Sequence, residues 1–343
     1  MNAKIISEQK FRNKITIITF ICSLFVIWIH TSNLDVYGIN ADSEGVAYVT
    51  FILEQIFGKV ITFATPMFFF VSGFLFFRNY ELSKTVYKYK SRIKSILIPY
   101  IVWNSIYYLF FVIVTNVPFL SSFANASTYV FSLTNWINAL WVDEYYTLWF
   151  LKNLIVFIIF SPIIYVLLKN WNKIPTGLIV LLLLLNIGYI SQKVNIPSGL
   201  EMYIAGSYIS INHKDIAMWS NKILSYFGVL FIAFMVITEY RYLNNTMQVL
   251  LFIGVWYALD LLIFRDDTPM PYFMRITFFT YVAHDLILES VEKIWLVLLG
   301  TKAVYALMDY LFAPIVTLAI LVGISKIISI KLPFLWKILN GYR

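Results

Sequence analysis

Two of the three histidines in this chain, His30 and His284, lie inside long apolar runs. Imidazole is well suited to take up a proton near neutral pH, which makes histidine the commonest general base. An ionisable group inside an apolar run is costly to bury and marks a functional site by default. We therefore predict that His30 and His284 are catalytic. The alternative for each is a histidine that only hydrogen-bonds to a neighbouring helix.

Small residues follow a proline in the segment between residues 65 and 78. Pro66 is expected to break or kink a helix, because proline lacks a backbone donor. Ser72 and Gly73 would let a ligand or another backbone approach closely, so a contact with substrate is one interpretation. Tight packing between two helices explains the same small residues equally well.

A dense basic stretch comes next, with six cations between residues 78 and 94. Lys84, Lys88 and Arg92 recur every four residues, so they share one helical face. Such a face suits the phosphates of an anionic ligand. Anionic lipid headgroups are the alternative partner.

The sequence lacks the patterns of several other chemistries. Three dispersed histidines and one cysteine, Cys22, do not have the spacing of a metal site, so we predict no metal and no bound cofactor. No Gly-rich phosphate-binding loop is present, which argues against ATP-driven work. The formal charge of +8 does not indicate nucleic acid, because the basic residues fall in patches between apolar runs.

Composition assigns the chain to the membrane. Its 343 residues are 60% hydrophobic and 13% charged, whereas soluble domains are roughly 45–50% apolar and 25% charged. So apolar a chain is not disordered, and a single cysteine excludes a disulfide scaffold. The predicted fold class is all-α, a polytopic membrane bundle of about ten transmembrane helices in a single domain over residues 1–343.

The apolar runs predict where these helices lie. The expected spans are 15–34, 60–77, 95–115, 147–168, 174–190, 199–212, 223–239, 246–264, 273–291 and 304–328. The sixth is short, since fourteen residues reach about 21 Å along a helix axis. A helical pattern over 44–58 is expected either at the interface or as an extension of the second span. Residues 117–146 are too polar to span and are expected to form an interfacial loop.

The basic residues predict the orientation of the chain. With ten spans and a cytoplasmic N-terminus, twenty of the 26 lysines and arginines fall on the cytoplasmic side. This bias is the one expected for cytoplasmic loops, so both termini are predicted to be cytoplasmic. No cleavable signal peptide is evident, and the first span is expected to act as an anchor.

Five motif-like segments occur in order along the chain. They are Phe20 to His30, Pro66-Met67-Phe68-Phe69-Phe70-Val71-Ser72-Gly73-Phe74, Arg92 to Tyr100 with Trp103, Leu148-Trp149-Phe150-Leu151, and Phe278 to His284. Taken together they resemble the integral-membrane acyltransferase-3 family, which includes O-acyltransferases of bacterial surface polysaccharides. The resemblance covers nearly the whole chain.

This resemblance implies a reaction and a place for it. The protein would move an acyl group, often acetyl, from cytoplasmic acyl-CoA to a hydroxyl of a surface polysaccharide or lipid-linked glycan precursor. It would do so in the bacterial cytoplasmic membrane. His30 would take the proton from the hydroxyl, and Lys84, Lys88 and Arg92 would bind the CoA phosphates. Contacts with substrate would come from Asn33, Ser72, Gly73, Trp149 and Tyr281.

Two positions depart from the family pattern. Many members carry arginine eleven residues before the first histidine, where this chain has Thr19, and Thr147 stands where relatives often have histidine. A non-catalytic partner in polysaccharide assembly therefore stays open as an interpretation. A transporter or flippase for a lipid-linked sugar or small solute is the other alternative, in which the buried polar residues would line a pathway.

Overall fold

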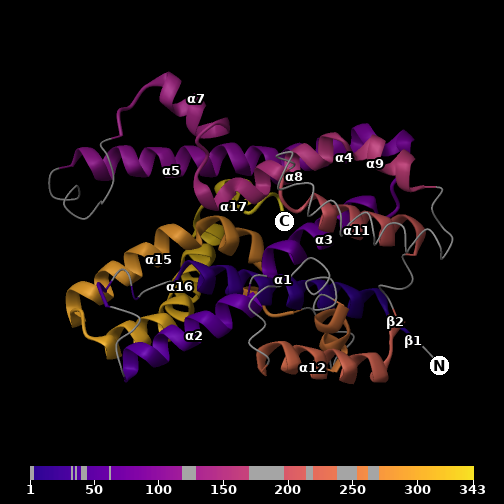
Figure 1. Cartoon of the computed structure of the whole chain (residues 1–343). Helices are drawn as coiled ribbons and strands as arrows, with labels where there is room; N and C mark the ends of the chain where they lie inside the picture. Colours follow the sequence, from indigo (N-terminus) through magenta and orange to yellow (C-terminus); the bar gives the residue numbers. More distant parts are fainter. Residues whose placement is uncertain are drawn as a thin grey trace. The chain divides into compact units, whose positions relative to one another are not determined.

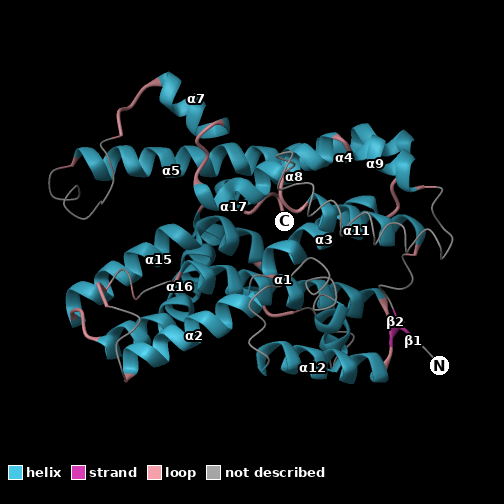
Figure 2. Cartoon of the chain, in the orientation of Figure 1, coloured by secondary structure: helices cyan, strands magenta, loops and turns pink. Residues whose placement is uncertain are grey.

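The computed structural model describes residues 4–31, 34, 37–39, 45–61, 63–117, 129–169, 197–213, 219–237, 253–261 and 270–343. These residues are almost entirely helical (Figures 1 and 2). The strand pairing among them joins β1 (Lys4–Ile5) to β2 (Trp219–Ser220) in antiparallel fashion. The predicted all-α class is therefore confirmed.

The chain divides into two compact units. Unit 1 comprises Met1–Leu82 and Phe160–Gly323, and unit 2 comprises Ser83–Ile159 and Ile324–Arg343. The helices that lie in unit 1 or begin there are α1 (Glu8–His30), α2 (Val46–Ile61), α3 (Ala64–Phe77), α9 (Ser161–Leu168), α11 (Leu200–Asn212), α12 (Lys222–Ile237), the 3-10 turn η5 (Leu259–Leu261), α14 (Tyr272–Arg275), α15 (Thr277–Leu299) and α16 (Ala303–Lys331).

Unit 2 is built on one long helical segment. This segment, Leu82–Asn116, joins the 3-10 turn η1 (Leu82–Lys84), α4 (Thr85–Arg92), the π-helix η2 (Ile93–Leu97) and α5 (Ile98–Asn116). The elements that pack with it are α7 (Leu133–Trp141), η3 (Tyr146–Leu148), α8 (Trp149–Ile159) and α17 (Pro333–Leu339). That the chain forms one domain stays a prediction.

Helix α1 packs against several other helices of unit 1. It begins after Ser7, whose hydroxyl accepts from the Lys10 amide at 3.1 Å and caps the helix. Towards its start, the carboxylate of Glu8 accepts two hydrogen bonds from Arg78, which follows α3. Towards its end, the ring of Phe25 packs on Phe63, which precedes α3, with centroids 5.6 Å apart. Helices α1 and α3 therefore run antiparallel.

The opposite relation holds between α1 and α15. The Phe20 ring lies 5.4 Å from that of Phe273 in α14, and the Ser23 hydroxyl donates to the carbonyl of Thr277 at 3.4 Å. Residue numbers increase in the same direction along both helices at these contacts, so α1 and α15 run parallel. In the predicted numbering these are the first and ninth spans, which share a direction, and α3 belongs to the second. The alternation agrees with the predicted topology.

The number of spans is only partly supported. By length and composition, three helices among the described residues are suited to cross a membrane, namely Glu8–His30, Leu82–Asn116 and Ala303–Lys331. A fourth results if Tyr146–Ile159 and Ser161–Leu168 count as one. The prediction of about ten is therefore not confirmed, although apolar helices of this length mark a membrane protein. The expected span 174–190 and much of 246–264 lie outside the described residues.

Several expected boundaries were wrong. The second span is a helix of only 14 residues, α3. The preceding helix ends at Ile61, and a new helix begins at Ala64 with Pro66 in its first turn. The 44–58 pattern forms a separate helix, α2. The expected loop 117–146 contains the helix α7, which Ser132 caps by accepting from the Asn135 amide at 3.0 Å.

Lys14, which the orientation count places on the cytoplasmic side, forms a buried pair with Asp260. Lys14 Nζ lies 3.0 Å from Asp260 Oδ1, and the two side chains are 0% and 3% exposed. The ammonium also lies 4.7 Å and 5.5 Å from the ring centroids of Trp256 and Tyr257. A buried pair with aromatic walls holds the first half of α1 against the segment that ends in η5.

We predict that Lys14→Met destabilises the protein by about 3–5 kcal/mol, because it leaves a buried carboxylate without its cation. The double variant Lys14→Met with Asp260→Leu should recover most of that loss. The measurement is the unfolding midpoint of the purified protein in detergent. Arg12→Gln on the exposed side of the same helix is the control and should change little. Equal losses in the single and double variants would contradict the pairing.

Candidate active site

The two histidines predicted to be catalytic meet in unit 1. The ring of His30, the last residue of α1, lies with its centroid 5.3 Å from that of His284 in α15. His284 is fully buried, whereas His30 is partly exposed. Of two imidazoles in contact, one is therefore accessible and the other is enclosed. Residues 254 positions apart in the sequence form this pair.

Packing around the pair explains its position. One turn before His30, Ile27 forms a buried apolar cluster with Leu288 and Val291 of α15 and with Ala313 of α16. The indole of Trp28 donates to the carbonyl of Tyr310 in α16 at 3.0 Å. These contacts hold the last turn of α1 between α15 and α16.

The hydrogen bond at His284 determines its tautomer. Its Nδ1 lies 2.6 Å from the carbonyl oxygen of Tyr281, which can only accept, so Nδ1 must carry the proton. In the neutral ring Nε2 then has a free lone pair. This atom is buried and has no hydrogen-bond partner within the described part of the chain. The arrangement supplies a fixed proton acceptor beside the more accessible ring of His30.

A carboxylate accompanies the two rings. Asp285 is 1% exposed and interacts electrostatically with both His30 and His284. A negative charge at this place stabilises an imidazolium, the species that forms when histidine takes a proton from a substrate. Among the described residues, no group of three or more histidine, cysteine, aspartate or glutamate side chains is arranged to hold a metal ion.

Of the predicted substrate-contact residues, Tyr281 lies beside His284, with ring centroids 6.4 Å apart. Tyr281 lies one turn before His284, and its ring centroid is 6.2 Å from that of Phe68 in α3. Ser72 follows Phe68 by one turn of the same helix and is partly buried. Unit 1 thus brings Tyr281 next to the helix that carries Ser72 and Gly73. Asn33 lies outside the described residues.

The remaining predicted residues belong to unit 2. Lys84, Lys88 and Arg92 lie at four-residue intervals on the continuous helical segment that starts at Leu82. Lys84 is exposed, and the other two are partly buried. The prediction that they lie on one helix is confirmed, and their role stays a prediction. Trp149 is the first residue of α8.

The comparison with protein-family models identifies the family of this chain. The model of the acyltransferase domain, Acyl_transf_3, matches residues 13–330. The chain belongs to the acyltransferase-3 family. No curated protein and no solved structure matches the chain. Family membership implies that this membrane protein is an acyltransferase, and the matched range includes both histidines of the pair.

Thr19, eleven residues before His30, is an uncharged residue in this acyltransferase. Its hydroxyl donates to the carbonyl of Ile15, one turn earlier, at 2.8 Å. Lys14 does not replace the arginine of other members, because it lies sixteen residues before His30, about 24 Å along the helix. No cation of α1 therefore reaches the histidine pair.

Gly73 has a clear packing role. A Cβ atom at this position would overlap the carbonyl oxygen of Tyr203 in α11 and would lie 3.0 Å from Ser207 Oγ. Gly206 of α11 faces the carbonyl of Phe70 in the same way. Helices α3 and α11 therefore approach with their backbones almost in contact, as Figure 1 also shows. The packing alternative that the sequence left open accounts for Gly73.

The tight approach predicts that Gly73→Ala lowers the stability of the acyltransferase by about 1–3 kcal/mol, since neither backbone can move aside easily. Gly58→Ala in α2 is the matched control, because its Cβ would have nothing within 4 Å. The control should be neutral or slightly stabilising. Thermal unfolding in detergent measures both, and equal stability of the two variants would refute the packing role.

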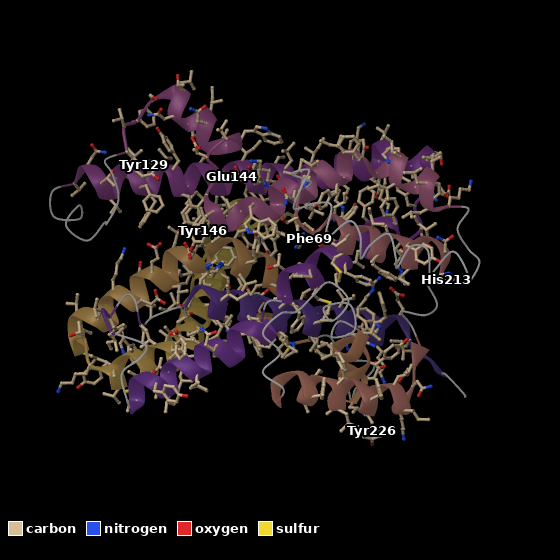
Figure 3. All side chains as sticks on the ribbon, in the orientation of Figure 1. Phe69, Tyr129, Glu144, Tyr146, His213 and Tyr226 are labelled. Atoms are coloured by element: carbon tan, nitrogen blue, oxygen red, sulfur yellow. The ribbon has the colours of Figure 1, made fainter. Side chains whose placement is uncertain are left out.

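Sequence reasoning missed a polar and aromatic cluster in unit 2. Lys152 of α8 forms an ion pair with Glu144 at 2.7 Å, and its ammonium lies 5.9 Å from the Trp141 ring. The rings of Tyr107 and Tyr145 stack with centroids 3.7 Å apart. Figure 3 labels Glu144 in the link between α7 and α8. Glu144 lies in the link before η3 whereas Lys152 lies in α8, so the pair does not fall within one helix and no helical periodicity revealed it.

Proposed function

We propose that this protein is an O-acyltransferase that moves an acyl group, commonly acetyl, from cytoplasmic acyl-CoA to a sugar hydroxyl. The acceptor is a surface polysaccharide or a lipid-linked glycan precursor. The enzyme would act in the bacterial cytoplasmic membrane with both termini on the cytoplasmic side. The observation that supports this most directly is the contact between His30 and His284 in a chain that belongs to the family.

The chemistry needs one base and one route for the proton. A sugar hydroxyl is a poor nucleophile until a base removes its proton. His30 takes that proton because it is the accessible ring of the pair, and the alkoxide oxygen attacks the thioester carbonyl. The tetrahedral intermediate then collapses, the carbon–sulfur bond breaks, and the CoA thiolate recovers the proton from the imidazolium. The products are an ester and free CoA, so no net proton is gained or lost.

The second histidine and the carboxylate support the first. The lone pair on Nε2 of His284 is suited to accept a hydrogen bond and so to orient His30. Asp285 stabilises the positive charge that His30 acquires during the reaction. Hydrogen-bond donors must stabilise the oxyanion of the intermediate, and we assign this role to Tyr281, whose ring lies beside that of His284.

The donor requires a cationic surface. CoA carries phosphates, which bind lysine ammonium groups through charge-assisted hydrogen bonds. We assign them to Lys84 and Lys88, on the face that Arg92 continues. The four-residue spacing along one helix allows a single ligand to contact neighbouring members of this face.

His30→Ala should lower the rate of acyl transfer by at least about 100-fold, because a general base contributes about 10²–10⁴-fold to such reactions. The assay measures CoA released from acetyl-CoA by the purified protein in the presence of a candidate glycan. His213→Ala is the matched control, since that histidine directly follows the last residue of α11 and contacts Tyr208, not the histidine pair. His30→Gln, which keeps the volume of the side chain, guards against misfolding. Wild-type rates in both His30 variants would exclude the proposed base.

Replacing Lys84 and Lys88 together by glutamine should raise the KM for acetyl-CoA about tenfold or more, since tenfold corresponds to about 1.4 kcal/mol of binding free energy. The kcat should change little, because the phosphates are remote from the reacting carbonyl. Lys90→Gln with Lys94→Gln removes the same charge from another helix face and serves as control. Equal effects of the two pairs would mean that only overall charge matters.

A further inference from the structure

Unit 2 contains a groove that shares Arg92, but no other lining residue, with the groups assigned to the proposed acyl transfer. It has a volume of about 230 Å³ and lies between α8 and the junction of α4 with η2. Its lining residues are Tyr89, Arg92, Ile93, Ile96, Leu97, Ile155, Ile158 and Ile159. The groove is therefore formed by two segments of unit 2 more than fifty positions apart in the sequence.

The π-helix η2 shapes one wall of the groove. In η2 the amide of Ile98 donates to the carbonyl of Ile93, five residues earlier, which widens the helix at this point. Pro99 follows immediately and has no amide proton to donate. Such single π-turns in an otherwise regular helix are frequent at functional sites.

The lining of the groove is suited to hydrocarbon. Six of its eight lining residues are isoleucine or leucine. The Tyr89 hydroxyl already donates to the carbonyl of Ile159 at 2.7 Å, so it adds little polarity. A sugar or the amide-containing arm of CoA would lose its hydrogen bonds with water here without replacement. A hydrocarbon chain loses nothing of this kind.

The groove also opens towards the lipid-facing surface. Ile93 and Ile159 line it and are 45% and 57% exposed, which is expected for side chains that contact the bilayer. A chain that enters the groove can therefore come sideways from the membrane.

One end of the groove is positively charged. Arg92 is the single charged residue among those that line it. Arginine binds phosphate through two parallel hydrogen bonds.

We propose that the groove binds an anionic phospholipid of the bilayer, with one hydrocarbon tail along the isoleucines and the phosphate against Arg92. An anionic phospholipid joins a phosphate and a hydrocarbon tail in one molecule, which matches a groove with a cation at its end. Lys84 and Lys88 do not line the groove and remain for the acyl donor. This assignment does not depend on the proposed acyl transfer.

The test uses the purified full-length protein in detergent and a phosphatidylglycerol with a photoreactive group in one tail. Illumination should attach the lipid within residues 89–97 and 155–159, as mapped by mass spectrometry. An excess of unlabelled phosphatidylglycerol should reduce labelling at least fivefold, and the same excess of phosphatidylcholine should not. Labelling elsewhere, or equal competition by both lipids, would overturn the proposal.

Variants separate the tail from the phosphate. Ile93→Trp should block the groove and abolish labelling, and Arg92→Gln should remove the preference for the anionic lipid. Ile113→Trp, at an exposed position of α5 outside the groove, and Lys94→Gln are the matched controls. Both controls should label like the natural protein. Competition by palmitoyl-CoA stronger than by phosphatidylglycerol would overturn the proposal, because it would assign the groove to the acyl chain of a donor.

Discussion

The contact between the two histidines depends on the register in which α1 packs against α15. The two helices run parallel, and Ser23 contacts Thr277 as His30 contacts His284. On each helix the two contact residues are seven positions apart. Seven residues make about two turns, so each pair falls on the same side of its helix. A shift of one residue in this register would turn one imidazole away from the other. The geometry of the histidine pair is therefore a property of the interface between α1 and α15.

The sequence was sufficient to single out His30 and His284 as candidates, and their catalytic role stays a prediction. Histidine in an apolar run is expensive, and this cost singled out His30 and His284 without any knowledge of the fold. That the two meet could not be predicted from periodicity, which describes each helix alone. Their meeting depends on contacts such as that of Ile27 with Leu288 and Ala313, whose side chains are ordinary apolar residues in the sequence.

Helix boundaries were predicted less well, and for identifiable reasons. An apolar window over 147–168 does not detect the break between α8 and α9, although Pro162 in the first turn of α9 was a local signal for it. Residues 117–146 were judged by their polarity, which conceals the nine-residue helix α7. Lys14 and Asp260 lie close to the ends of the expected spans 15–34 and 246–264, where a charged side chain commonly reaches water. Pairing with each other allows both to be buried, and no sequence pattern relates residues so far apart.

Helix α1 is held at both ends, by the ion pair of Lys14 with Asp260 and by the indole bond of Trp28 to Tyr310. Sliding of this helix along its axis would break both contacts together. These contacts fix His30, at the end of the helix, within unit 1. In the proposed reaction the thioester and the alcohol would therefore each travel to a fixed point, and any opening or closing that admits them would occur in parts of the protein other than α1.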